Sequence, residues 1–327
     1  MSGGVVDPAP VARGFGWLML IALAVFLLNS VLTFWAGMPG ALALLSGELE
    51  GAATGYAALQ VALWVLVPVL TVWHVRRTIY RSLREDAGRI HRFNVLLVRC
   101  AFWVVFFVGL GDAVLSFLRV EGMLEGYVGA ELAADLGRSQ FRGPTFHVPL
   151  IVLGILVGLV TRTLGFTWLA LLVVLAELLI VICRFVFSYE QAFMADLVRF
   201  WYGALFLFAS AYTLYDDGHV RVDLFYAGFS RASKGVVNAW GSILLGMLLC
   251  WTILYLGFRS SSAVIVSPIL VFEVTQAGFG LYVKYFMAGF LGVFAVTMLI
   301  QFVSQFFEAI ADKRGEPGAR ETHAEVM

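Results

Sequence analysis

A series of long apolar runs constrains this chain more than any other feature. A hydrocarbon layer of about 30 Å requires about 20 helical residues to cross it. A transmembrane β-barrel would instead alternate apolar and polar residues in segments of about ten. The sequence therefore predicts an all-α, polytopic integral membrane helix bundle. Eight runs have suitable length, at residues 15–35, 56–75, 100–118, 146–160, 165–187, 197–215, 236–258 and 281–303.

Composition excludes the other broad classes. Hydrophobic residues make up 61 % of the chain and charged residues only 13 %, whereas soluble domains carry about 25 % charged residues. A soluble globule and a disordered chain are both excluded on this ground. Nucleic-acid binding is not expected either, because 22 basic residues are balanced by 22 acidic residues.

The fourth and fifth runs are separated only by Thr161, Arg162, Thr163 and Leu164. A single bent helix is the alternative to two helices here. About 40 residues would be twice the thickness of a bilayer, so we expect two helices.

The distribution of basic residues predicts the orientation. Cytoplasmic loops of membrane proteins carry an excess of Lys and Arg. With the N-terminus inside, fifteen of the 22 basic residues fall in inner segments and four in outer segments. The remaining three, Arg184, Arg199 and Lys284, lie near outer span ends, where long side chains can reach the interface. We expect both termini to be cytoplasmic.

Two inner segments show helical spacing of apolar residues among basic ones. Ile79, Tyr80, Leu83, Ala87 and Ile90 form the first set, and Leu224, Phe225, Phe229 and Ala232 the second. Amphipathic basic helices bind the anionic membrane surface. We expect such surface helices at both places, with a solvated loop as the alternative.

Signatures of catalysis and of cofactor binding are absent from the sequence. It contains no phosphate-binding glycine loop, no HExxH and no CxxC. None of the five histidines lies in the middle of a predicted span, as a haem ligand pair would require. The three cysteines lie in or beside apolar runs and suit packing. We expect no enzyme activity, no cofactor and no metal site.

Ionisable and polar residues inside the spans are the remaining candidates for function. Glu177 lies in the middle of the fifth run, where a charge costs about 2.5–3.5 kcal/mol on insertion scales. It is either a proton or cation site or a carboxyl bonded to another helix or a partner subunit; the second is favoured. Asp112 is expected near the outer interface, and Gln301 is expected to link helices. Gly154 and Gly158 form a GxxxG pair that suits close helix packing.

Marks of a substrate pathway are sparse. Transporter cores usually contain broken helices at mid-depth. Here Pro68 is the only proline in the middle of a span. This pattern favours a scaffold or accessory subunit.

The stretch from residue 184 to residue 301 carries the most specific pattern. His219-Val220-Arg221-Val222-Asp223 follows the sixth run. Together with Arg184, Arg199, Glu273, Lys284 and Gln301, this string resembles the small membrane subunit of tripartite ATP-independent periplasmic (TRAP) transporters. The resemblance covers the last four spans. It implies a four-helix core at residues 165–305, preceded by a four-helix extension at 1–164 and followed by a cytoplasmic tail at 306–327.

The resemblance also implies a function and partners. The small subunit is similar to a fixed scaffold in the bacterial inner membrane that holds a large elevator-type subunit. That large subunit imports organic acids or similar solutes with sodium, and a periplasmic solute-binding protein delivers them. His219 and Arg221 would then lie at the inner headgroup level, and Asp223 would cap the following helix. A stand-alone transporter or channel that uses Glu177 for ion coupling is the alternative.

Overall fold

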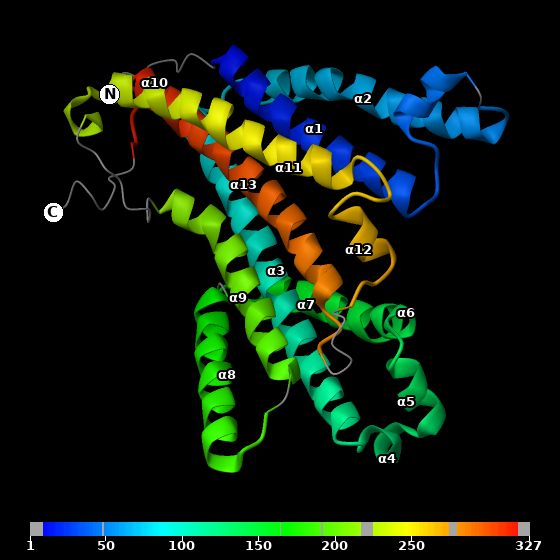
Figure 1. Ribbon diagram of the computed structural model, residues 1–327. Helices are drawn as coiled ribbons and strands as arrows, with labels where there is room; N and C mark the ends of the chain where they lie inside the picture. The colour runs from blue at the N-terminus through cyan, green and yellow to red at the C-terminus, as the bar shows by residue number, and fades with distance from the viewer. Residues whose placement is uncertain are drawn as a thin grey trace. The chain divides into compact units, whose positions relative to one another are not determined.

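The computed structural model describes residues 9–47, 49–163, 165–190, 192–216, 225–274 and 280–319. All regular structure in these residues is helical (Figure 1). The elements, in chain order, are α1 (Pro10–Phe34), η1 (Ala41–Ser46), α2 (Ala52–Arg77), α3 (Leu83–Val120), α4 (Leu124–Val128), α5 (Ala130–Leu136), α6 (Ser139–Arg142), η2 (Gly143–His147), α7 (Val148–Val160), α8 (Phe166–Phe187), α9 (Ala192–Tyr215), η3 (Tyr226–Gly228), α10 (Arg231–Gly241), η4 (Ser242–Met247), α11 (Leu248–Phe258), α12 (Val266–Leu270) and α13 (Lys284–Lys313).

The prediction of eight spans is confirmed, because eight helices of the described chain are long and apolar enough to cross a membrane. The fourth span is continuous from Ser139 to Val160 through the π-helical turn η2, and the seventh runs from Arg231 to Phe258. The fourth and fifth runs form two helices, since α7 ends at Val160 and α8 starts at Phe166.

The chain divides into two compact units. Unit 1 comprises Met1–Phe93, Leu214–Leu254 and Met298–Met327, and unit 2 comprises Asn94–Thr213 and Tyr255–Thr297. Each unit therefore combines residues from both sides of residue 164. The division of the chain into an extension and a core at that point remains a prediction.

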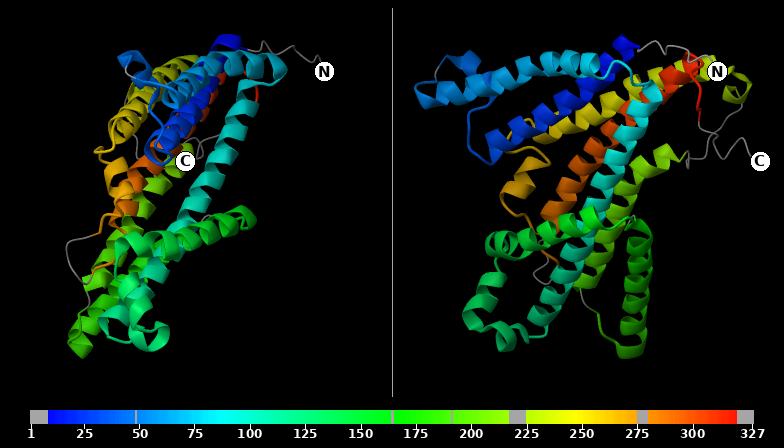
Figure 2. Two further views of the ribbon diagram at one scale, coloured as in Figure 1. Left: turned by 90° about the vertical axis from the view of Figure 1, so that its right-hand side faces the viewer. Right: turned by 180° about the vertical axis from the view of Figure 1, so that it is seen from behind.

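Unit 1 is built around the C-terminal part of α13. α1 and α2 lie side by side in each view (Figures 1 and 2). Gly16 of α1 lies beneath the Phe307 ring, and Phe15 meets Phe306 edge to face, with ring centroids 5.3 Å apart. On α10, a Cβ at Gly235 would come within 2.6 Å of the Lys313 amide nitrogen. Small residues thus let α1 and α10 approach α13 closely.

The prediction of a membrane-surface helix between the second and third spans is wrong. α3 begins at Leu83 and continues without interruption to Val120. The Leu83, Ala87 and Ile90 side chains are buried, and the Ser304 hydroxyl of α13 donates to the Ala87 carbonyl over 2.9 Å. The apolar side of this segment packs against protein, because α13 covers it. Only Tyr80, before the helix, is fully exposed.

The second predicted surface segment is divided in the structure. Leu224 lies outside the described residues, η3 is a short turn, and Ala232 belongs to α10. The Ser230 hydroxyl caps α10 by accepting the Ser233 amide over 3.2 Å. Phe225 is exposed, so contact of this side chain with a membrane remains a prediction.

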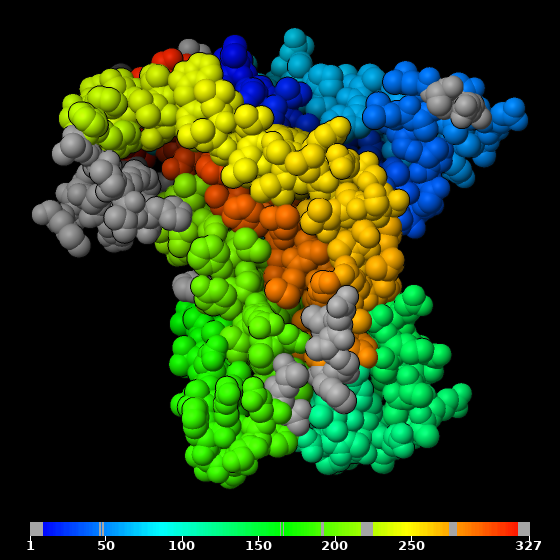
Figure 3. Space-filling view, viewed as in Figure 1, coloured from blue at the N-terminus to red at the C-terminus, as the bar shows by residue number. Residues whose placement is uncertain are grey.

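Unit 1 also presents an apolar surface. The leucines Leu244, Leu245, Leu248 and Leu249 are all more than half exposed. Figure 3 shows the helices that carry them, η4 and α11, on the face drawn. Exposed leucines in a membrane span are suited to contact with lipid or with another membrane protein.

In unit 2, α7 packs directly on α3. A Cβ on Gly154 would lie 2.6 Å from the Val104 Cα, and one on Gly158 would lie 2.7 Å from the Cys100 Cα. The GxxxG pair therefore brings the two helix backbones together. Phe290 of α13 packs against Phe200 and Phe208 of α9, with ring centroids 5.1 and 5.0 Å apart.

Candidate functional site

Unit 2 contains a buried cluster of charged and polar side chains around Asp112. This residue lies on α3 and has no exposed surface. Its Oδ1 forms an ion pair with Arg142 Nη2 over 2.6 Å and accepts from His147 Nε2 over 2.7 Å. Its Oδ2 accepts from the Tyr282 amide over 2.8 Å. Arg142 and His147 therefore enclose Asp112, and its position near the outer interface remains a prediction.

His147 hydrogen-bonds through both ring nitrogens. Because Nε2 meets the Asp112 carboxylate, which can only accept, Nε2 carries a proton and donates. Its Nδ1 lies 2.6 Å from the Tyr285 hydroxyl. Tyr285, His147 and Asp112 therefore form one continuous chain of hydrogen bonds.

Arg142 is fully buried and provides the positive charge that balances Asp112 in this cluster. Its Nη2 also donates to the Asp112 carbonyl over 3.1 Å and to the Ser116 hydroxyl over 3.0 Å. Its Nε and Nη1 have no hydrogen-bond partner among the described residues. The guanidinium lies 4.6 Å from the centroid of the Tyr282 ring, so the ring face stabilises the cation.

The cluster connects distant parts of the chain. Asp112 comes from α3, Arg142 from α6, His147 from η2 and Tyr285 from α13. Arg119 of α3 donates to the Tyr282 hydroxyl, and that hydroxyl donates to the Gly137 carbonyl over 2.7 Å. The arrangement suits a structural connection between helices; within the described residues, no group of three or more His, Cys, Asp and Glu is placed to hold a metal ion.

Glu177 lies on α8 and is exposed. The described residues provide it with no hydrogen bond or ion pair. Only 6 % of the most apolar stretch of α8 is buried within the chain, compared with 50 % for α13. The structure therefore presents a carboxyl group in the middle of an apolar helix that has little protein around it.

The other predicted residues of this region form short-range contacts. Arg184 lies 3.8 Å from Glu190, and Arg199 lies 3.7 Å from Asp196; both arginines are more than half exposed. Glu273 and Lys284, eleven residues apart, form an ion pair at the start of α13.

Gln301 is buried in unit 1. Its Oε1 lies 3.1 Å from His91 Nδ1, and the His91 ring stacks on Tyr215 with centroids 3.2 Å apart. Gln301 therefore contacts α3 from α13. The remaining predicted residues, His219, Arg221 and Asp223, lie outside the described residues.

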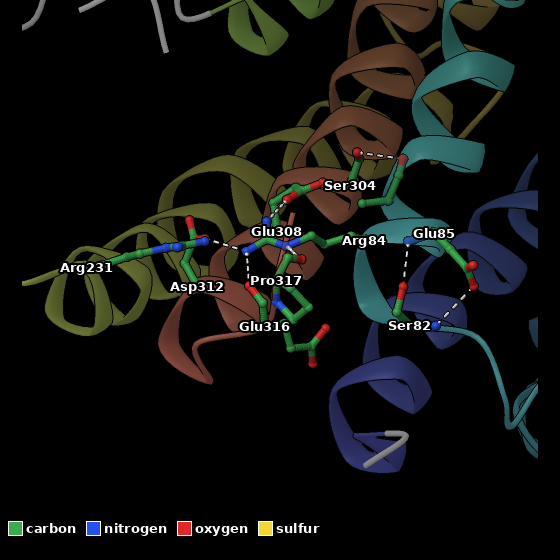
Figure 4. A network of polar contacts seen from close by, with 10 residues as sticks. Ser82, Arg84, Glu85, Arg231, Ser304, Glu308, Asp312, Glu316 and Pro317 are labelled. Atoms are coloured by element: carbon green, nitrogen blue, oxygen red, sulfur yellow. Dashed lines mark hydrogen bonds and ion pairs between the residues drawn. The ribbon is translucent and has the colours of Figure 1, made fainter. Parts of the chain in front are cut away.

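A second polar network, in unit 1, is centred on Arg84 (Figure 4). The Arg84 guanidinium pairs with Glu308 and, over 2.7 Å, with Asp312 of α13. Its Nε donates to the Pro317 carbonyl over 3.0 Å, and Arg231 of α10 reaches the same Asp312 oxygen over 2.9 Å. Arg84 thus ties the start of α3 to the end of α13, and Asp312 extends the network to α10.

Sequence reasoning did not identify either network. Asp112, Arg142 and His147 each carried a weak signal, an ionisable residue within or beside an apolar run. The signal is strong only when these residues are taken together, because a buried charge requires an opposite charge.

The eight long apolar helices of the described residues define a multi-pass membrane protein. Residues 171–312 match the family model of the DctQ component of tripartite ATP-independent periplasmic (TRAP) transporters. The match confirms the resemblance seen in the last four spans. The helices before residue 171 are consistent with an N-terminal extension. No curated protein and no solved structure matches the chain.

Proposed function

We propose that this subunit is a fixed scaffold that holds the large TRAP membrane subunit. The family implies both that partner and a solute-binding protein. By the same resemblance, the complex takes up an organic acid or a similar small solute with sodium across the bacterial inner membrane. The excess of basic residues in alternate loops supports cytoplasmic termini.

The exposed carboxyl of Glu177 carries this proposal. A charged or polar group in hydrocarbon is costly, and the described residues of the chain offer Glu177 no partner. A hydrogen-bond donor on a helix of the large subunit would satisfy it. The low burial of α8 supports the same conclusion, since this helix has space for a neighbour along most of its length.

Co-purification tests the scaffold role. The large subunit carries the affinity tag, and the amount of this chain retained in detergent is measured. We expect Glu177→Leu to weaken retention about three- to thirtyfold, since an interhelical polar contact in a membrane contributes about 0.6–2 kcal/mol. Glu131→Leu is the matched control, because Glu131 is exposed on the short helix α5. Equal retention of the two variants would contradict a contact through Glu177.

The alternative function is transport by this chain alone, with Glu177 as the coupling residue. Reconstitution into liposomes separates the two functions. The scaffold proposal predicts that the chain without the large subunit accumulates no organic acid under a sodium gradient. Uptake by the single chain that is lost on Glu177→Gln would overturn the scaffold proposal and establish the alternative.

A further inference from the structure

Unit 2 contains an apolar pocket between α3 and α8. Its volume is about 300 Å³, at the lower end of the roughly 300–1,000 Å³ of small-molecule pockets. Phe102, Trp103 and Phe106 form the α3 wall, and Trp168 and Leu172 belong to the α8 wall. Such a lining offers almost no hydrogen bonds, so it selects an apolar occupant.

The pocket begins where the end of α7 and the start of α8 meet the middle of α3. Gly158, near the end of α7, packs on Cys100 of α3. At the start of α8, a Cβ on Gly165 would lie 3.2 Å from the Phe102 Cβ. Trp168, one turn further along α8, is 60 % exposed. Tryptophan is enriched where hydrocarbon meets the headgroups, so the pocket extends from this boundary into the hydrocarbon layer.

Two arginines lie at the same level. Arg99 precedes Phe102 and Trp103 by one helical turn on the same side of α3. Its Nε donates to the Gly158 carbonyl over 2.7 Å, and its two Nη groups have no hydrogen bond to the described residues. Arg162, in the link between α7 and α8, is exposed and has no side-chain partner among the described residues. Guanidinium groups bind phosphate through paired N–H donors.

We infer that this pocket binds an anionic phospholipid, with one acyl chain between α3 and α8 and the phosphate between Arg99 and Arg162. The apolar lining matches the chain, and the two cations match the headgroup. Arg99 and Arg162 both belong to the segments that the distribution of basic residues places at the cytoplasmic side. Anionic lipids concentrate in that leaflet.

The site is independent of the scaffold role, because every residue that forms it belongs to this subunit. The site would, however, make the junction between the extension and the family core a lipid-binding region. The lipid would fill the space between α3, which precedes the family match, and α8, which carries its start.

Lipid titration of the purified full-length chain tests the inference. Delipidated protein in mild detergent receives phosphatidylglycerol or phosphatidylcholine, and native mass spectrometry counts the bound molecules. We expect one tightly bound phosphatidylglycerol and weaker binding of phosphatidylcholine. Arg162→Gln should lower the phosphatidylglycerol affinity about fivefold, as expected for one basic residue at an anionic surface, without changing phosphatidylcholine binding. Arg259→Gln, at another exposed arginine of unit 2, should have no effect.

A second pair of variants tests the acyl-chain pocket. Leu172→Trp places extra volume in the pocket and should abolish binding of both lipids at this site. Leu178→Trp adds the same volume to an exposed part of α8 outside the lining and should leave binding unchanged. Thermal unfolding of both variants shows whether each is folded. Cross-linking of a phospholipid with a photoreactive acyl chain to wild-type protein should label the walls of α3 and α8.

Three results would overturn the inference. They are equal affinity for the two lipids in the wild type, unchanged binding in Leu172→Trp, and cross-links of the photoreactive lipid that avoid α3 and α8. In the complex, cross-links from this pocket to the large subunit in place of lipid would assign the space to a partner side chain and equally exclude a lipid.

Discussion

At the scale of single residues, the Asp112 cluster shows how a membrane protein can bury full charges. The carboxylate accepts hydrogen bonds from the His147 side chain and the Tyr282 amide and forms an ion pair with Arg142. Removal of one partner from a buried pair is costlier than replacement of the whole pair, because the remaining charge has no compensation. The cluster is therefore expected to be sensitive to single substitutions.

The substitution Asp112→Asn removes the negative charge and leaves Arg142 buried without a counterion. We expect a loss of about 3–5 kcal/mol in stability, measured as a lower unfolding midpoint in detergent. Asp135→Asn is the matched control, because its ion-pair partner Arg138 is 69 % exposed and such a pair should contribute at most about 1 kcal/mol. Equal effects of the two substitutions would show that the Asp112 cluster is not a stabilising centre.

At the scale of helices, glycines determine which pairs approach closely. Gly158 faces the Cys100 backbone of α3, whereas Gly241, at the end of α10, has no atom within 4 Å of a built Cβ. Both glycines lie in helices with negative φ, so alanine carries no conformational penalty at either position. Any difference between them must come from packing.

Gly158→Ala should destabilise the protein by about 1–3 kcal/mol, because the helix backbones have to separate. Gly241→Ala should be neutral or stabilising by about 0.5–1 kcal/mol, since alanine favours a helix over glycine. Thermal unfolding of the two variants in one detergent measures the difference. A similar gain in stability for both would mean that α7 does not pack on α3 at this point.

The Arg84 network predicts a dependence on ionic strength. Arg84→Ala removes links from α3 to Glu308, Asp312 and Pro317. We expect a loss of about 2 kcal/mol at low salt that becomes smaller in 1 M NaCl, since partly exposed ion pairs are screened. Arg92→Ala is the control, because Arg92 is exposed on the same helix. A loss that does not change with salt would contradict an electrostatic origin.

At the scale of the whole molecule, both compact units contain helices that precede the family match and helices within it. α13 contacts α1 through Gly16, α3 through Gln301 and the Asp112 cluster through Tyr285. Helix α13, which lies within the family match, thus packs against residues that precede the match.

A split chain tests this dependence. Residues 165–327 expressed alone should unfold or aggregate in detergent, because α13 would lose the partners of its buried side chains. Co-expression with residues 1–164 should restore a complex that co-purifies, measured by size-exclusion chromatography. If residues 165–327 alone formed a monodisperse protein as stable as the full chain, the extension would be dispensable for folding.

Hydropathy and span length suffice to predict the eight spans and the two helices on either side of Arg162, while particular residues carry the family resemblance of the last four spans. They fail for the start of α3, where Leu83, Ala87 and Ile90 have the spacing of a surface helix. That spacing shows only that one side of the helix is apolar. Whether lipid or α13 covers it depends on residues more than 200 positions away, such as Ser304.

The sequence alone determined that this protein crosses a membrane as helices and that its last four spans resemble a transporter subunit. The first follows from local properties, since the cost of placing a residue in hydrocarbon is set segment by segment, and the second follows from residue types at particular positions along the chain. The tertiary structure decided which charges neutralise each other and which apolar sides remain open. Asp112 meets Arg142, His147 and Tyr282 only when α3, α6, η2 and the segment before α13 come together, whereas Glu177 is left exposed. Partners brought together by long-range packing have no fixed spacing along the chain, so no local pattern reveals them.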